Sequence, residues 1–259
     1  MYYLFSDAYH YRGLVTIFGP RNNRGPYRGI YCSFRNRLFK KRIKGAVLIL
    51  ILGLLLSYLI GSIPTAYIFG RIFKGIDIRK HGSGNVGATN AFRVLGPAIG
   101  ITVLALDALK GVIGVVPVAD FILKQQVVNE LLIRVLCGVI AVLGHSFTVF
   151  LNFKGGKGMA ATLGVLIGLS LKFSVLKIIL LSEILIWLMV FLFSRIVSLA
   201  SLVSAVTFPV FFIVLRQPWP LILMSLGLSI FIIARHKPNL SRLLKNQEPR
   251  LILNKKKKI

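Results

Sequence analysis

A glycine-rich run at residues 82–90, GSGNVGATN, is the first part of the sequence whose residue types could hold an anion. Glycines let consecutive backbone N–H groups turn towards an anion, while Ser83 adds a hydroxyl and Arg93 a two-pronged guanidinium. The letters match G-x-G-x-x-G, but that dinucleotide fingerprint must follow a buried strand, whereas this run follows an apolar segment and a basic stretch. The run therefore predicts a phosphate-binding turn, with an ordinary glycine-rich turn between helices as the alternative.

A second glycine-rich run, FKGGKG at residues 153–158, follows the pair Gly144-His145 and leads into an apolar segment. It differs from a Walker A phosphate loop because Lys157 is followed by Gly158 instead of Ser or Thr. A glycine loop with one lysine at the start of a helix still combines N–H groups, the helix dipole and an ammonium. The sequence predicts a second anion site here, and a short loop whose lysines only fix topology is the alternative.

A third polar group is split between two segments near the end of the chain. Ser198 and Ser201 are three residues apart, so they share one helix face, where small residues can equally serve helix packing. His236 and Asn239 stand at the end of the last apolar segment, where helix capping is the default role. All three polar groups fall on the same predicted side of the membrane, and this convergence indicates a site.

Charged residues inside the apolar segments are expected to face the interior of the bundle, because an unpaired charge in hydrocarbon is costly. Asp107 and Lys110 are three residues apart and are predicted to form a structural ion pair. Glu130 and Arg134 have the i,i+4 spacing of a second pair, whereas Glu183 is too isolated to assign.

Missing patterns exclude several chemistries. None of the four histidines has an aspartate five residues later, so the His-x4-Asp motif of the common soluble-donor glycerolipid acyltransferases is absent. No cluster of His, Cys, Asp or Glu has metal-ligand spacing, and no Gly-x-Ser-x-Gly elbow indicates a hydrolase. The sequence therefore predicts no metal and no cofactor, and a site rich in cations but poor in carboxylate bases.

The elements that must position these residues are membrane helices. The chain has 259 residues, 56% of them hydrophobic and only 15% charged, and its mean hydropathy is +0.78. A water-soluble domain would carry about a quarter charged residues. Apolar segments lie at residues 46–73, 97–121, 127–151, 159–171, 174–193, 196–215 and 219–234. The predicted fold is an all-α integral membrane protein with about seven transmembrane helices and cytoplasmic glycine-rich loops, in which 159–171 is too short to cross a core of about 30 Å.

Basic residues gather at the two ends of the chain, and this predicts partners and orientation. The chain holds 33 Lys and Arg against 7 Asp and Glu, a net charge of +26. Residues 1–44 contain ten basic residues and one acid, and residues 235–259 contain nine and one. Membrane lipids with anionic headgroups and phosphorylated ligands are the expected partners, and nucleic acid is not. The positive-inside rule places the C-terminal tail and both glycine-rich loops in the cytoplasm.

The sequence divides into a basic N-terminal extension (1–46), a membrane domain (47–244) and a basic cytoplasmic tail (245–259). The extension contradicts the positive-inside scheme because its basic residues would lie outside. We interpret it as translated upstream sequence before a functional start near Val47, or alternatively as a disordered basic arm on the membrane surface.

Five blocks in the same order make residues 48–251 resemble the bacterial membrane acyl-phosphate:glycerol-3-phosphate acyltransferase family. The blocks are GSGNVGATN with Arg93, LDxxKG at 106–111, GH with FKGGKG at 144–158, VSLAS at 197–201, and RHxxN with RLL at 235–244. Met159 and Thr148 stand where the family more often has Val and Pro, and the N-terminal extension has no family counterpart.

The resemblance implies a seven-helix enzyme of the bacterial inner (cytoplasmic) membrane that moves a fatty acyl group from acyl phosphate to the 1-hydroxyl of glycerol 3-phosphate. Lysophosphatidic acid and phosphate are the implied products, in the first step of phospholipid synthesis, and a soluble enzyme that makes acyl phosphate is a candidate partner. Six side chains would bind glycerol 3-phosphate: Ser83, Arg93, Lys157, Ser201, His236 and Asn239. Four of them, Ser83, Arg93, Lys157 and His236, are implied to be catalytic. The backbone at Gly84, Asn85, Gly87, Gly155, Gly156 and Gly158 would hold the acyl phosphate.

Two questions stay open at the level of the sequence. The proton of the attacking hydroxyl could go to His236 as a general base or to a phosphate oxygen of a substrate, and we favour the phosphate. A transporter of an organic phosphate is the competing class of protein. Such a transporter should show paired broken segments in two related halves, whereas only residues 159–171 are short and no repeat is visible.

Overall fold

The computed structural model describes residues 28–124 and 129–251 of the chain. The chain divides into two compact units, Met1–Gly45 and Ala46–Ile259. In the first unit, residues 28–45 are the beginning of helix α2 (Arg28–Ser62). Residues 1–27, on which most of the predicted N-terminal extension falls, lie outside the described residues.

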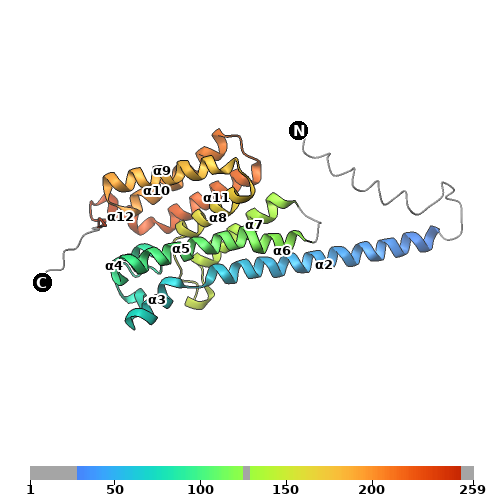
Figure 1. Ribbon diagram of the computed structural model, residues 1–259, viewed down its shortest axis with the longest axis horizontal. Helices are drawn as coiled ribbons and strands as arrows, with labels where there is room; N and C mark the ends of the chain where they lie inside the picture. Colours follow the sequence, from blue (N-terminus) through green and yellow to red (C-terminus); the bar gives the residue numbers. More distant parts are fainter. Residues whose placement is uncertain (1–27, 125–128, 252–259) are drawn as a thin grey trace. The chain divides into compact units, whose positions relative to one another are not determined.

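The described part of the second unit is built from helices, and no strand occurs among its described residues, as predicted. Its longer helices after α2 are α3 (Thr65–Lys74), α4 (Ala88–Leu95), α5 (Pro97–Ile113), α7 (Glu130–Ser146), α8 (Met159–Lys172), α9 (Leu176–Ser194), α10 (Val197–Val214), α11 (Trp219–Arg235) and α12 (Lys237–Leu244). Shorter turns of helix are η2 (Ile78–Lys80), η3 (Gly114–Val118), α6 (Ala119–Leu123) and η4 (Val149–Leu151). Figure 1 shows these helices along their length.

The predicted apolar segments all coincide with helices, but the predicted count of seven membrane spans is not confirmed. Five stretches of the described residues are long and apolar enough to cross a membrane: Lys44–Lys74, Pro97–Leu123, Glu130–Leu151, Leu176–Ser194 and Val197–Val214. A sixth is obtained if α11 and α12, which are bent by 60° relative to each other, count as one span. Helix α8 has only 14 residues, which is the shortness expected for 159–171.

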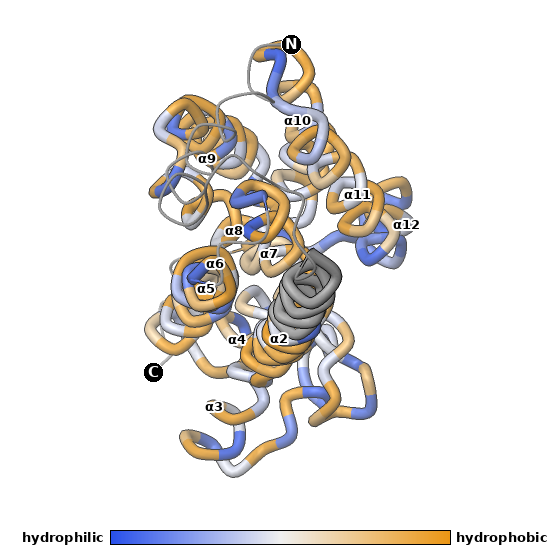
Figure 2. The backbone as a smooth tube through the Cα atoms, turned by 90° about the vertical axis from the view of Figure 1, so that its right-hand side faces the viewer, coloured by the Kyte–Doolittle hydropathy of each residue, from blue (hydrophilic) through white to orange (hydrophobic). Residues whose placement is uncertain are grey.

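Helix α8 lies in the interior of the second unit. Figure 2, which looks along the helices, shows α7 and α8 between α9, α10 and α11 on one side and α5 and α6 on the other. Helix α5 approaches α8 so closely that a Cβ atom on Gly164 would lie 1.8 Å from the carbonyl oxygen of Ala108. Small residues at this crossing therefore let the two backbones touch, as is common between membrane helices. The start of α8 is held in place by this packing.

Sharp connections bring the beginning of α10 next to the bend between α11 and α12. Arg195 adopts a left-handed conformation with a φ of 59° and ends α9, so that α10 begins only two residues later. Helices α11 and α12 meet at His236, and α12 contacts both α10 and α11. The third predicted polar group is thereby assembled from segments that are about 40 residues apart in sequence.

Candidate active site

A cavity of about 400 Å³ unites the three polar groups predicted from the sequence. All six side chains predicted to bind glycerol 3-phosphate line it: Ser83, Arg93, Lys157, Ser201, His236 and Asn239. Of the six residues predicted to contribute backbone groups, Asn85, Gly87 and Gly158 line the same cavity. Gly84 and Gly155 instead face a second hollow beside Arg79. The folded chain therefore places most of the predicted residues around one space.

Two helices begin at this cavity. Helix α4 starts after Gly87 and α8 starts after Gly158, and both glycines line the cavity wall. The first N–H groups of a helix have no partner within it, and its N-terminus carries a partial positive charge. Gly158 has a φ of 89°, a left-handed conformation that strains any residue with a Cβ atom. Two helix N-termini therefore offer N–H donors to one anion site.

Lys157 adds a partly buried positive charge to the cavity. Its ammonium donates a hydrogen bond to Oδ1 of Asn239, and Nδ2 of Asn239 donates to Glu248 at 2.6 Å. Burial lowers the pKa of Lys157 to about 8, against the opposing effect of the Glu248 carboxylate and with the guanidinium groups of Arg242 and Arg93 lowering it further. The ammonium is therefore charged at neutral pH but close to the range in which it loses its proton.

Glu248 is the main residue of the site that the sequence did not identify. Its carboxylate accepts hydrogen bonds from Ser198 at 2.8 Å and from Arg242 at 2.7 Å, in addition to the one from Asn239. Burial raises the pKa of Glu248, but these hydrogen bonds outweigh that effect and hold the pKa below its usual value. Glu248 falls in the predicted cytoplasmic tail, so the boundary drawn at residue 244 separates residues that the structure brings together. The one available signal was a lone acid among nine basic residues.

His236 presents one ring nitrogen to the cavity as an acceptor. Its Nδ1 lies 2.8 Å from the carbonyl oxygen of Ile232, and a carbonyl can only accept, so Nδ1 carries the hydrogen. In a neutral ring Nε2 is then free to accept a hydrogen bond from a hydroxyl group. Ser201, the other predicted ligand on this side, accepts a hydrogen bond from Nε1 of Trp187 at 3.3 Å. Trp187 also lines the cavity.

The first glycine-rich loop is organised by Asn90, whose buried amide satisfies four backbone groups. Its Nδ2 donates to the carbonyl oxygens of Ile78, His81 and Asn85 at 3.3, 3.1 and 2.9 Å. Its Oδ1 accepts from the N–H of Ser83 at 2.9 Å. Asn90 belongs to the run recognised in the sequence but not to the predicted binding residues. In the structure, the hydrogen bond from the N–H of Ser83 to Asn90 holds Ser83 at the cavity.

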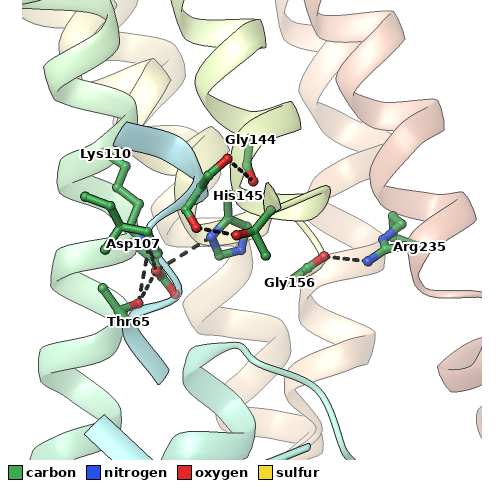
Figure 3. A network of polar contacts seen from close by, with 10 residues as sticks. Thr65, Asp107, Lys110, Gly144, His145, Gly156 and Arg235 are labelled. Carbon is green, nitrogen blue, oxygen red and sulfur yellow. Dashed lines mark hydrogen bonds and ion pairs between the residues drawn. The ribbon is translucent and has the colours of Figure 1, made fainter. Parts of the chain in front are cut away.

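Backbone groups of three predicted glycines are already hydrogen-bonded within the chain. The N–H groups of Gly155 and Gly156 each donate at 3.0 Å to carbonyl oxygens at the end of α7, and the N–H of Gly84 donates at 3.1 Å within its own loop. Arg235 in turn donates to the carbonyl oxygen of Gly155 at 3.2 Å and to that of Gly156 at 2.9 Å, and Figure 3 shows the second of these bonds. These glycines therefore shape the loop, and the N–H groups left for an anion are those at Asn85, Gly87, Gly158 and the helix starts that follow.

Away from the polar groups the cavity becomes apolar. Its lining there comes from Leu104, Leu163, Leu166, Ile184, Leu188, Ala205, Phe208 and Ile232. Along α10 the lining runs from Ser198 to Phe208, ten residues or about 15 Å at 1.5 Å per residue. Glu183 also lies in this wall, where Ser204 and Thr207 donate hydrogen bonds to its carboxyl group.

The two predicted ion pairs are confirmed. Lys110 Nζ lies 2.5 Å from Asp107 Oδ1, and both side chains are almost fully buried. Arg134 contacts Glu130 at 2.8 Å and also Asp120 at 2.5 Å, an acid that was not part of the predicted pair.

The cavity combines a cation-lined polar end with an apolar section. This combination suits a ligand with a phosphorylated head and a hydrocarbon chain.

Comparison with known proteins gives a consistent result. A sequence profile described as glycerol-3-phosphate acyltransferase matches residues 51–246. A Moorella thermoacetica protein named glycerol-3-phosphate acyltransferase 2 is 43% identical over 201 residues, which cover 78% of this chain and 97% of the relative. A Fusobacterium nucleatum protein named glycerol-3-phosphate acyltransferase is 42% identical over 195 residues, which cover 75% and 94%.

Solved structures agree with these relatives. The crystal structure of PlsY (YgiH), described as an integral membrane glycerol 3-phosphate acyltransferase in its glycerol 3-phosphate form, aligns with a TM-score of 0.68 and 37% identity. That alignment covers 80% of this chain and 96% of the PlsY chain. The lysophosphatidic acid form of PlsY aligns with a TM-score of 0.66 and 36% identity, over 81% and 96% of the two chains.

Proposed function

The chain belongs to the glycerol-3-phosphate acyltransferase family, and we propose that it transfers a fatty acyl group from acyl phosphate to the 1-hydroxyl of glycerol 3-phosphate. Lysophosphatidic acid and inorganic phosphate are the products, which makes the reaction the first step of phospholipid synthesis. The PlsY structures were determined in glycerol 3-phosphate and lysophosphatidic acid forms, and this supports the acceptor and the product. The donor is argued from the site.

The observation that carries the proposal is the convergence of two helix N-termini and Lys157 on one cavity that continues into an apolar section. Both proposed substrates carry a phosphate, and the polar end has cations and N–H groups enough for two anions. Ser83, Arg93, Lys157, Ser201, His236 and Asn239 hold glycerol 3-phosphate in this proposal. The phosphate of the donor lies at the N–H groups of Asn85, Gly87 and Gly158, and its acyl chain occupies the apolar section.

The proposed reaction is a direct displacement at the acyl carbonyl carbon. The 1-hydroxyl oxygen of glycerol 3-phosphate forms a bond to this carbon, and the bond between the carbon and the phosphate oxygen breaks. Phosphate leaves with the electron pair of that bond, and a phosphate oxygen takes the hydroxyl proton. Acyl phosphate is a mixed anhydride with a good leaving group, so the protein mainly orients the substrates and stabilises charge.

His236 orients the acceptor in this mechanism, because its free ring nitrogen is a hydrogen-bond acceptor inside the cavity. His236→Gln then raises the KM for glycerol 3-phosphate and keeps most of kcat. A collapse of kcat at saturating substrate would instead make His236 the general base.

The location that we propose is the bacterial inner (cytoplasmic) membrane, with the active site towards the cytoplasm. The basic loops that carry Lys74, Arg79, Lys80, Lys154 and Lys157 support this orientation by the positive-inside rule. Both substrates, glycerol 3-phosphate and an acyl phosphate made by a soluble enzyme, are then supplied from the same side as the site.

The direct test is the formation of lysophosphatidic acid from labelled glycerol 3-phosphate by the purified protein in detergent and lipid. Acyl phosphate and acyl-CoA are offered in parallel, with Lys157→Ala as the control. We expect product from acyl phosphate alone and its loss in the variant. Product from acyl-CoA would refute the proposed donor, and no product from either donor with folded protein would refute the proposed reaction.

A further inference from the structure

A buried polar network begins at Asp107 and His145, which both line the cavity, and continues to Thr65 and Lys110, which are not among its lining residues (Figure 3). Asp107 Oδ1 accepts hydrogen bonds from Thr65 and Lys110, both at 2.5 Å, and Lys110 also donates to the carbonyl oxygen of Ile63 at 2.6 Å. Only 1% of Asp107 and 4% of Lys110 is exposed. The carboxylate is thus fixed in place by Lys110 on its own helix and by Thr65 on α3. It faces the imidazole of His145, whose Nδ1 lies 3.6 Å from the same oxygen.

The other edge of the His145 ring rests against the second glycine-rich loop. A Cβ atom on Gly156 would lie 2.1 Å from His145 Nε2, so the ring occupies the place that a side chain would need. The N–H of Gly156 donates to the carbonyl oxygen of His145 at 3.0 Å. Arg235 donates to the carbonyl oxygen of Gly156 at 2.9 Å. Gly156 is therefore enclosed by His145 and Arg235, with Asp107 behind the imidazole.

The residues after Gly156 are the anion-binding ones. Lys157 follows directly, and Gly158 ends the loop in the left-handed conformation from which α8 begins. A displacement of Gly156 would therefore move the ammonium of Lys157 and the first N–H groups of α8 together.

We infer that His145 is a positioning residue for the acyl transfer. Its ring, which lies between Asp107 and the loop, fixes Gly156 and thereby aims Lys157 and the N-terminus of α8 at the substrate phosphates. The inference rests on the proposed function, and it assigns to Asp107 and Lys110 a role beyond that of a structural ion pair. A misplacement of about 1 Å in a site that works by orientation can cost roughly 100-fold in rate.

The test is a pair of substitutions, of which the first creates a steric clash and the second relieves it. Gly156→Ala drives a methyl group into the His145 ring, and His145→Ala in the same chain makes room for it. Gly155→Ala is the matched control, because its Cβ atom would lie 2.2 Å from the backbone carbonyl oxygen of His145, which His145→Ala does not remove. The readouts are kcat and KM for both substrates and the unfolding temperature in detergent.

We expect Gly156→Ala to lower kcat/KM by about 100-fold and His145→Ala by about 10-fold. The double variant His145→Ala/Gly156→Ala should recover at least 10-fold over Gly156→Ala, while His145→Ala gives no recovery in Gly155→Ala. Losses that simply multiply in the Gly156 pair, or wild-type kinetics in His145→Ala, would overturn the inference. If Gly156→Ala does not fold, recovery of a folded protein by His145→Ala supports the inference and its failure overturns it.

A second readout separates this inference from the proposed function. Inorganic phosphate should raise the unfolding temperature of the wild type, and this effect should be lost in Gly156→Ala and recovered in the double variant. Failure of the wild type to make lysophosphatidic acid refutes the proposed reaction, whereas an unrecovered phosphate effect in the double variant refutes the positioning role.

Discussion

The pH dependence of acceptor binding should follow the protonation of Lys157. The pKa of this ammonium is lowered to about 8 by burial, and the charged form is the one that attracts a phosphate. The charged form therefore predominates below pH 8 and is lost above it. The ratio of charged to neutral lysine is about ten to one at pH 7 and about one to ten at pH 9. We expect kcat/KM for glycerol 3-phosphate to fall about tenfold between these two pH values.

Lys157→Arg is the matched variant for this prediction, because a guanidinium stays charged at every pH used. Its activity at pH 7 is lower, since an arginine does not reproduce the contact of a lysine with Asn239. Its kcat/KM should nevertheless stay flat from pH 7 to 9. Lys157→Ala removes the charge altogether and should lower kcat/KM by about 10- to 150-fold, which corresponds to about 1.5–3 kcal/mol for a hydrogen bond to a charged group.

The assay is the initial rate of lysophosphatidic acid formation at low glycerol 3-phosphate and saturating acyl phosphate, in buffers of constant ionic strength. The rate of acyl phosphate hydrolysis without enzyme is measured at each pH, and the donor concentration is corrected for it. A wild-type kcat/KM that stays constant to pH 9.5, or an equal fall of kcat/KM in Lys157→Arg, would refute the assignment of this pH dependence to Lys157.

Two further predictions concern the framework of the site. Gly158→Ala forces a Cβ atom into a left-handed conformation with a φ of 89°, which should cost about 1–2 kcal/mol and lower the unfolding temperature. Gly227→Ala, where a Cβ atom meets open space within a helix, is the control that should show no loss. Lys110→Met leaves the Asp107 carboxylate buried without its cation and should cost about 3–5 kcal/mol, and an unfolding temperature equal to that of the wild type would contradict the importance of the pair.

Residue types and spacing were sufficient to predict which loops line the cavity. Glycine next to Ser83, Arg93 or Lys157 is a local pattern, and the positive-inside rule placed these loops on one side of the membrane. The apolar segments were equally visible, including the short one that became α8. These features are encoded by neighbouring residues, so no tertiary information was needed.

The parts that the sequence did not predict depend on contacts between distant segments. Glu248 enters the cavity only because α12 turns at His236 and brings the tail back to Ser198. The hydrogen bonds of Gly155 and Gly156 to the end of α7 likewise arise from the path of the loop, and the residue types do not reveal that these N–H groups are occupied. The number of membrane spans depends on helix length and bending as well as on hydropathy.

The most direct test of the account is to measure lysophosphatidic acid and inorganic phosphate together, with the purified protein and acyl phosphate, with and without glycerol 3-phosphate. One cavity that holds both substrates for a direct displacement predicts equal amounts of the two products, and no enzyme-dependent phosphate release without the acceptor. A burst of phosphate without glycerol 3-phosphate, or acyl label bound covalently to the protein, would contradict it.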